Sequence, residues 1–200
     1  MSPLITTKAS ASAQGYGLFS PTAVVAGNFT SIATQTVGSG GASSITFSSI
    51  PSTYTHLQLR FIGQSSRTNI SLDETHIQFN GDTGANYSAK WVFGNGSSAS
   101  STSATSVTDI QLGYGFIGDS LSGAFGAGVL DILDYTNTNK NKTTRFVGGV
   151  DMNGVVGSYG GRSGMSSGLW LNTAAISSIQ LFPANGNWNQ YSSFALYGVK

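Results

Sequence analysis

The chain has 200 residues and a formal net charge of +1, and only 8% of its side chains are charged. Soluble proteins usually have about a quarter of their residues charged, so hydroxyl and amide groups supply most of the polarity here. The chain contains 27 Gly and no Cys, which excludes disulfides and zinc sites with thiolate ligands. Catalysis, metal capture and nucleic-acid binding all draw on charged side chains. Composition therefore favours a binding or structural protein without a nucleic-acid partner.

The first predicted element is an extended N-terminal arm over residues 1–28. Its larger apolar side chains gather in Gly15-Tyr16-Gly17-Leu18-Phe19, without the alternation typical of a strand. Tyr16, Leu18 and Phe19 are candidate docking residues, which either contact a partner subunit or cover an edge of the chain's own sheet. The arm lacks the pattern of a secretory signal. No stretch reaches the roughly 20 apolar residues of a membrane helix, so no membrane insertion is expected.

Residues 29–200 are expected to form one all-β domain. Apolar and polar residues alternate in short segments, as around Leu57, Leu59 and Phe61, and this period of two is typical of half-buried strands. The expected strands lie, in chain order, within residues 45–47, 55–63, 77–79, 91–93, 110–112, 129–135, 144–150, 168–171, 176–182 and 193–199. Residues 94–106 are rich in Ser, Thr and Gly and are expected to form a long exposed loop.

Four Asn-Gly pairs punctuate this region, beginning at Asn80, Asn95, Asn153 and Asn185. Asn-Gly readily adopts the positive φ angles that a type I′ turn requires at both central residues, and such turns join antiparallel strands. Many short strands with Gly-rich turns are typical of two packed sheets. The sequence therefore predicts an antiparallel β-sandwich, jelly-roll-like, with the extended N-terminal arm outside it.

Two enzyme motifs occur, and neither has the context that its chemistry needs. Gly164-Met165-Ser166-Ser167-Gly168 matches a nucleophile elbow, which requires an acid and then a His further along the chain. Both His precede this motif, and no Asp or Glu follows Asp151. Gly113, Gly115 and Gly118 match a dinucleotide motif, but three more Gly follow where a helix is needed. No catalytic residue and no cofactor is predicted.

Acidic residues occur beside one of the two His. Asp73 and Glu74 closely precede His76, and residues 129–135 hold two further Asp. Neither group supplies the three or four convergent ligands of a metal site. Ser71-Leu72-Asp73-Glu74 also fits a capping box, which indicates a short helical turn. No metal site is predicted, and a bound calcium ion stays an open alternative.

A polar hairpin tip is predicted at residues 136–143, between two expected strands. Its Lys140 and Lys142 are expected to lie in solvent. If the preceding strand is regular, Asp131 and Asp134 point to opposite faces of the sheet, which argues against a paired-carboxylate site.

Residues 184–191, with the sequence ANGNWNQY, combine aromatic and amide side chains. Aromatic faces beside amides are groups that hold a sugar, through apolar stacking and neutral hydrogen bonds. Trp188, Asn189 and Tyr191 are therefore candidate contacts for a surface glycan. Packing of Trp188 in the core is the favoured alternative for that residue, and Trp170 is assigned to the core.

Several blocks of the chain resemble a structural module of tailed-bacteriophage virions, including those of cyanophages. They are Ser44–Pro51 with Tyr54–Arg60, the stretch DILDYTNTNKNKTTR at residues 131–145, and residues 168–200, which contain GLWLNTAAISSIQLFP and YSSFALYGVK. The N-terminal ASASAQGYGLF resembles the short arm that often precedes this module. Together the blocks cover most of the chain.

The resemblance implies a non-enzymatic virion protein at the surface of the phage particle, in contact with other virion proteins. A homo-oligomer is expected, with a trimer favoured. In the leading hypothesis the protein is a tail-fibre or receptor-binding component whose loops at 94–106, 136–143 and 183–190 face the host surface and its glycans. The alternative is a capsid decoration (cement) protein or head fibre that stabilises the capsid shell. The family has no catalytic motif to transfer.

Overall fold

The computed structural model describes residues 28–68, 72–113, 122–152 and 160–200. Twelve strands and no helix occur in these ranges. The strands are β1 (Phe29–Thr36), β2 (Ile45–Phe47), β3 (His56–Gly63), β4 (Thr75–Phe79), β5 (Tyr87–Gly94), β6 (Ala99–Val107), β7 (Ile110–Gln111), β8 (Gly126–Leu133), β9 (Lys142–Asp151), β10 (Gly161–Trp170), β11 (Ile179–Pro183) and β12 (Ser193–Val199). A helix long and apolar enough to span a membrane is absent from the same ranges.

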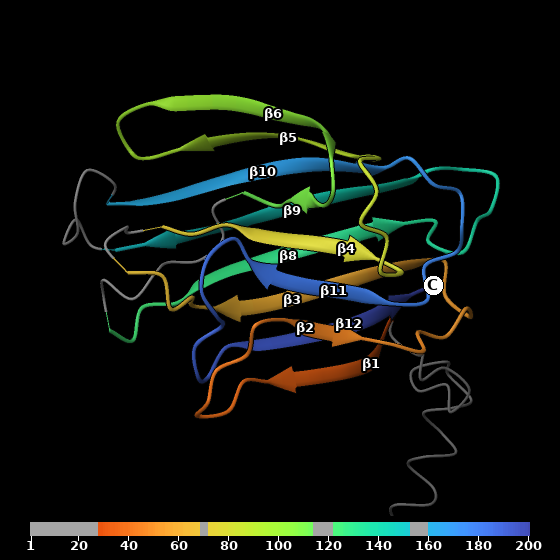
Figure 1. Ribbon diagram of the computed structural model, residues 1–200, viewed down its shortest axis with the longest axis horizontal. Coiled ribbons are helices and arrows are strands. Elements are labelled where there is room, and N and C mark those ends of the chain that lie inside the picture. The colour runs from red at the N-terminus through yellow and green to blue at the C-terminus, as the bar shows by residue number, and fades with distance from the viewer. Residues whose placement is uncertain (1–27, 69–71, 114–121, 153–159) are drawn as a thin grey trace, which may run out of the picture.

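The strands form two antiparallel sheets (Figure 1). The large sheet has eight strands in the order β1-β12-β3-β8-β9-β10-β5-β6, and the small sheet has four in the order β2-β11-β4-β7. Four chain-adjacent pairs of strands hold matching positions in the two sheets, namely β1 with β2, β12 with β11, β3 with β4, and β8 with β7. The predicted all-β class and antiparallel sandwich are confirmed.

Two hairpins, β9–β10 and β5–β6, extend the large sheet by four strands that have no counterpart in the order of the small sheet (Figure 1). The outermost strand, β6, lies where a long loop was expected, and that expectation is wrong. β6 pairs with β5 in a ladder that runs from Gly94↔Ala99 to Tyr87↔Val107. Backbone hydrogen bonds to a neighbour therefore form this strand, although its small polar side chains bury little apolar surface. β1, absent from the expected strands, is likewise an edge strand with mostly exposed residues.

The core lies between the sheets and is rich in aromatic side chains. Leu57 and Leu59 are fully buried, as their alternation in the sequence predicts. Trp170 is also buried and packs against Tyr87 and Phe79, with ring centroids 6.0 Å and 5.6 Å away. The assignment of Trp170 to the core is therefore confirmed.

The Asn-Gly turns differ from the predicted type I′ hairpins. Both residues of Asn80-Gly81 have positive φ, 54° and 67°, as predicted, but this turn leads from β4 in the small sheet to β5 in the large one. In Asn95-Gly96 and Asn185-Gly186 only the glycine has positive φ. Asn95-Gly96 does join the paired strands β5 and β6, and the pair at 153–154 lies outside the described residues.

Lys142 is fully buried, so the expectation that it lies in solvent is wrong. It is the first residue of β9 and faces inward, where its Nζ donates hydrogen bonds to the carbonyls of Asn137, Lys140 and Thr173 at 2.6, 2.8 and 2.9 Å. These acceptors replace the water that a buried ammonium loses. Burial lowers the pKa of Lys142, an effect that the nearby Asp134 opposes. Lys140 remains mostly exposed, as expected.

The chain enters and leaves the sandwich at the same end. Phe29 is paired with Val199, and the amide of Lys200 donates to the carbonyl of Asn28 at 3.1 Å. The hairpin tip at 134–141 lies at this end too, whereas the β5–β6 tip and the β11–β12 connection lie at the opposite end (Figure 1). The three loops expected to face the host together are therefore divided between the two ends.

Two predicted features fall partly or wholly outside the described residues. Residues 1–27 of the N-terminal arm are outside them, with the candidate docking residues Tyr16, Leu18 and Phe19. Ser71 of the expected capping box is outside as well, and the described residues 72–74 contain no helical turn.

Candidate functional site

A pocket of about 460 Å³ opens at the end of the sandwich opposite Asn28 and Lys200. Its lining comes from four connections, those between β1 and β2, β3 and β4, β7 and β8, and β11 and β12. The lining residues are Ser39, Gly40, Gly41, Gln64, Ser66, Ser122, Gly123, Phe125, Asn187, Trp188, Asn189, Gln190 and Tyr191. Every one of these described residues is uncharged, so we call this site the neutral end pocket.

Backbone hydrogen bonds fix the β11–β12 connection between its neighbours. Trp188 exchanges two of them with Ala42, at 2.7 and 3.1 Å. On the other side the amide of Asn189 donates to the carbonyl of Gln64 at 2.8 Å, and the amide of Ser66 donates to the carbonyl of Asn187 at 2.7 Å. The floor of the neutral end pocket is therefore built from paired backbone and needs no ligand to hold its shape.

Two side-chain amides orient each other inside this pocket. Nδ2 of Asn189 donates to Oε1 of Gln64 and to the carbonyl of Ser65, both at 3.1 Å. Nε2 of Gln64 in turn donates to the carbonyl of Ala124 at 3.0 Å. Because these bonds come from three separate connections, the amides have fixed directions. A fixed amide offers a neutral hydrogen-bonding group to a ligand at little cost in conformational entropy.

Trp188 is fully buried, so its assignment as a glycan contact is wrong and the favoured alternative of core packing is correct. Its Nε1 donates to the carbonyl of Leu181 at 3.4 Å, and its ring meets Phe194 edge-on at 4.8 Å between centroids. An indole held between the sheets has no free face for a sugar. The sequence ANGNWNQY does not reveal this, because the burial depends on Ala42 and Ser65, which bridge to Trp188 from distant segments.

Tyr191 presents an aromatic ring at the rim of the pocket. It is 69% exposed, and its backbone has a φ of 73°, in the left-handed region that bulky residues rarely adopt. Its amide donates to the carbonyl of Val37 at 3.0 Å, which helps to hold this conformation. Strain of this kind concentrates at functional positions. Asn189 and Tyr191 thus remain candidate glycan contacts, beside a pocket that the sequence alone did not define.

The residues that sequence reasoning missed lie in the other three connections. Gln64 follows a strand directly, and Phe125 precedes one, with no local pattern that marks either as a pocket residue. The Gly-Ser run at residues 38–41 is the one local signal, since small flexible residues between two strands often allow close backbone approach. Gly41, for example, has a φ of 69° and lies against the carbonyl of Trp188.

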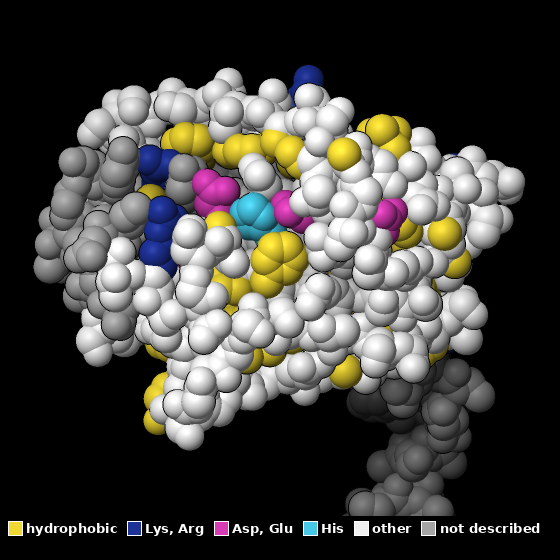
Figure 2. All heavy atoms as spheres, viewed as in Figure 1, with side chains coloured by type: hydrophobic (Ala, Val, Ile, Leu, Met, Phe, Trp, Pro, Cys, Tyr) yellow, Lys and Arg dark blue, Asp and Glu magenta, His cyan; other side chains and the backbone are white. Residues whose placement is uncertain are grey.

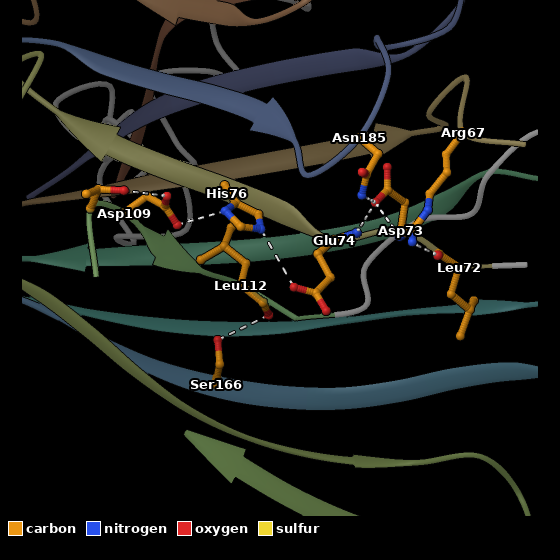
Figure 3. Close-up of polar contacts among 10 residues, drawn as sticks. Arg67, Leu72, Asp73, Glu74, His76, Asp109, Leu112, Ser166 and Asn185 are labelled. Carbon is orange, nitrogen blue, oxygen red and sulfur yellow. Dashed lines mark hydrogen bonds and ion pairs between the residues drawn. The ribbon is translucent and has the colours of Figure 1, made fainter. Parts of the chain in front are cut away.

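A group of charged side chains near this end lies on the outer face of the small sheet, around His76 (Figure 2). Nδ1 of His76 lies 2.7 Å from Oδ1 of Asp109, and its Nε2 lies 3.6 Å from Oε2 of Glu74 (Figure 3). The ring also packs on Phe182, with centroids 5.6 Å apart. Burial alone would lower the pKa of His76, but Asp109 and Glu74 outweigh it and raise the pKa to about 9. His76 is therefore a cation at neutral pH, held between two carboxylates.

A second ion pair stands beside it, between Arg67 and the fully buried Asp73. Nη1 of Arg67 lies 3.1 Å from Oδ1 of Asp73, which also accepts a hydrogen bond from the amide of Glu74 at 2.9 Å (Figure 3). These contacts tie the β3–β4 connection together. Despite the nearby acids, the described residues contain no group of three or more His, Asp or Glu arranged to hold a metal ion.

The nucleophile-elbow motif has no catalytic geometry. Ser166 is buried in the middle of β10, where its Oγ donates to the carbonyl of Leu112 at 3.3 Å (Figure 3). The motif requires a sharp turn from a strand into a helix, and here it continues as a strand through Gly168. Of the dinucleotide motif, only Gly113 lies in the described residues.

No protein-family model matches the chain, and no curated protein matches it either.

Proposed function

We propose that this chain is a non-enzymatic structural protein of a bacteriophage virion, and that its neutral end pocket binds an uncharged glycan of the host surface. The observation that carries this proposal is that the two ends of the sandwich differ. The chain enters and leaves at one end, and the neutral end pocket opens at the other. A protein attached to the particle near Asn28 presents this pocket outward, as a tail-fibre or receptor-binding component does.

The chemistry of the pocket suits a sugar. A neutral glycan offers hydroxyl groups in fixed directions and apolar C–H faces, and these match oriented amides and an exposed aromatic ring. Asn189 supplies a partly exposed amide, which the buried Gln64 orients, and Tyr191 supplies the ring. The volume of about 460 Å³ lies in the range of small-ligand pockets. Because the described lining is uncharged, binding is expected to depend little on salt.

The strand order supports a jelly roll, as the sequence suggested. Without the β5–β6 and β9–β10 hairpins, the sheets have the orders β1-β12-β3-β8 and β2-β11-β4-β7. This alternation of chain-adjacent strands between two four-stranded sheets is consistent with a double-sheet jelly roll, a fold of viral capsid and lectin domains. In the proposed particle the protein is a homotrimer, attached to other virion proteins at the end where Asn28 lies.

The second candidate function is capsid decoration, which the outer face of the large sheet favours. That face carries several exposed apolar side chains, including Val147 and Met165, and a cement protein needs apolar contact with its shell. Cryo-electron microscopy of the particle separates the two functions. Density for this protein on the tail contradicts decoration, and density confined to the capsid surface contradicts the tail-fibre assignment.

Binding of the purified protein to surface polysaccharide extracted from the host tests the glycan site. We expect saturable binding in isothermal titration calorimetry, and a Kd about tenfold weaker for Tyr191→Ala, because the lost stacking accounts for roughly 1.4 kcal/mol. Leu171→Ala is the matched control, since Leu171 is another exposed apolar residue, 55% accessible, at the opposite end of the sandwich. Wild-type binding by Tyr191→Ala, or no binding by the wild type, contradicts the glycan assignment.

A further inference from the structure

The outer face of the large sheet carries a row of four apolar side chains, one from each of four adjacent strands. Val92 of β5 lies opposite Met165 of β10, Met165 opposite Val147 of β9, and Val147 opposite Val129 of β8. Directly opposed side chains on one face are in contact range. All four are exposed, Met165 and Val147 most of all, at 57% and 56%. We call this set the apolar row.

The apolar row belongs to a wider apolar region. Six of the eight exposed large hydrophobic residues in the described ranges lie on this one face, the apolar row together with Ile62 and Phe29. A groove of about 760 Å³ follows the row, with Lys90, Asp131 and Arg145 along its polar side. A contiguous exposed apolar surface with polar residues at its side is typical of an interaction site, so this face is a candidate surface for an apolar occupant.

The charged residues on this face argue against the same face of a second copy of the chain as the occupant. Arg60, Lys90 and Arg145 stand on this face with Asp131, which is paired with Arg145 at 2.8 Å. Two such faces in contact would bring a surplus of cations together in a desolvated interface, which is unfavourable. The occupant should instead be apolar and uncharged. Residues 9–27 of the chain contain no charged side chain and include Tyr16, Leu18 and Phe19.

Residues 16–19 can reach the apolar row from Phe29, near the start of the described chain. Phe29 lies on the same outer face, with its ring 5.1 Å from the guanidinium of Arg60, and Arg60 is the register partner of Val129. Val147 is four strands from β1 in the sheet, a separation of about 19 Å at the usual strand spacing. It lies about 13 Å further along the strand direction, so the direct distance is about 23 Å. Ten residues from Phe19 to Phe29 span about 33 Å when extended.

We propose that residues 16–19 of each chain lie across the apolar row of that same chain and cover Val129, Val147 and Met165. Contact with a partner subunit and covering of the chain's own sheet were both open roles for these residues, and the proposal favours the second. It places them on the outer face of the large sheet, whereas the sequence suggested an edge. It is independent of the glycan site, and it leaves residues 1–15 and the end at Asn28 for contact with other virion proteins.

Disulfide trapping tests the docking directly, because the chain has no Cys of its own. In the full-length double variant Leu18→Cys/Val147→Cys, we expect rapid oxidation to an intrachain disulfide, mapped by peptide mass spectrometry. The control pair is Leu18→Cys/Thr46→Cys. Thr46 is exposed on the small sheet beside β1, where its carbonyl accepts from Gln35, so an undocked segment reaches it as easily. The intrachain disulfide should form about tenfold faster in Leu18→Cys/Val147→Cys than in Leu18→Cys/Thr46→Cys, because docking raises the effective concentration of the segment beside position 147.

Equal rates for the two pairs overturn the proposal, and so does a product that is mainly interchain, which would assign the row to another copy's segment. A second measurement avoids introduced cysteines. Met165 is expected to be oxidised by hydrogen peroxide several-fold faster in Leu18→Ser/Phe19→Ser than in the wild type, because docking shields its sulfur. The fully buried Met152 serves as the internal standard for intact folding. An unchanged rate at Met165 also contradicts docking.

Discussion

The two ends of the sandwich hold their loops by different chemistry. At the end near Asn28, charged groups are built into the connections: Lys142 binds three carbonyls, and Asp82 accepts hydrogen bonds from Trp170 and Asn86 at 2.8 and 2.9 Å. The hydrogen bond from Asn86 and those from Gly84 and Trp170 lower the pKa of Asp82 to about 2. At the other end, backbone pairs and neutral amides join one connection to the next around the pocket, while the Arg67–Asp73 ion pair lies within the β3–β4 connection itself.

This difference suggests a division of labour. Bonds to ionised groups are stronger than neutral ones, so they suit connections whose role is structural. A glycan pocket needs groups that lose little hydration when they meet uncharged hydroxyls, and amides fulfil that condition. Near the pocket end, His76 pairs with Asp109 and Glu74, and Arg67 pairs with Asp73. These charged side chains do not line the neutral end pocket.

The largest expected effect comes from removing the ammonium group of Lys142 at the end near Asn28. Lys142→Met keeps the apolar stem but leaves three carbonyls without their donor, so the free energy of unfolding should fall by about 4 kcal/mol. Lys140→Met is the matched control on the same turn, because its exposed pair with Asp134 contributes at most about 1 kcal/mol. Guanidinium unfolding measures both. Equal decreases in the free energy of unfolding of the two variants would contradict a structural role for the buried charge at this end.

The second-largest effect concerns His76, whose positive charge stabilises the fold and does not line the pocket. Because its pKa in the folded state is about 9, above the ordinary 6.5, its stabilisation is complete below pH 6.5 and is lost as the pH rises through 9. The loss can reach about 3 kcal/mol. His76→Gln should flatten this part of the stability profile between pH 6 and 10, measured by urea unfolding. A variant with the wild-type slope would show that other groups cause it.

Prediction from the sequence succeeded where burial imposes a pattern. The alternation around Leu57 and Leu59 predicted β3, since one face of that strand is wholly in the core. It missed β1 and β6, because an edge strand needs only a neighbour's backbone and its side chains carry no such pattern. Lys142 was misplaced for a related reason. Its burial requires the carbonyl of Thr173, which is far away in the sequence.

The candidate site was predicted in part for the same physical reason. Residues 184–191 have a composition that indicates sugar binding, and Asn189 and Tyr191 do line the pocket. The partners that give these residues their geometry, Gln64 and Val37, come from two separate connections, directly after β3 and β1. Only the register of the folded sheets brings them together, and local sequence does not encode that register in a readable way.

A smaller effect is expected at the pocket end, from Gly41→Ala. Gly41 has a φ of 69°, and an added Cβ would lie 2.9 Å from the carbonyl oxygen of Trp188. The backbone bridge between Trp188 and Ala42 must then shift, so we expect a loss of about 2 kcal/mol in stability together with weaker glycan binding. Gly40→Ala is the control, since nothing lies within 4 Å of its added Cβ. Thermal unfolding and calorimetric binding, measured on both variants, should change only for Gly41.

The smallest effect distinguishes function from stability most sharply, because the two should change in opposite directions. Tyr191 has a left-handed backbone with a φ of 73°, which glycine adopts without strain. Relief of this strain in Tyr191→Gly should therefore raise the free energy of unfolding by about 1 kcal/mol. The higher conformational entropy of glycine in the unfolded chain offsets part of this gain. The same change removes the exposed ring and should weaken glycan binding about tenfold. Tyr191→Asn is the control, since Asn tolerates this backbone but offers no aromatic face. If Tyr191→Gly is both less stable and unaltered in binding, then the strained backbone serves the fold and the pocket has no stacking residue at its rim.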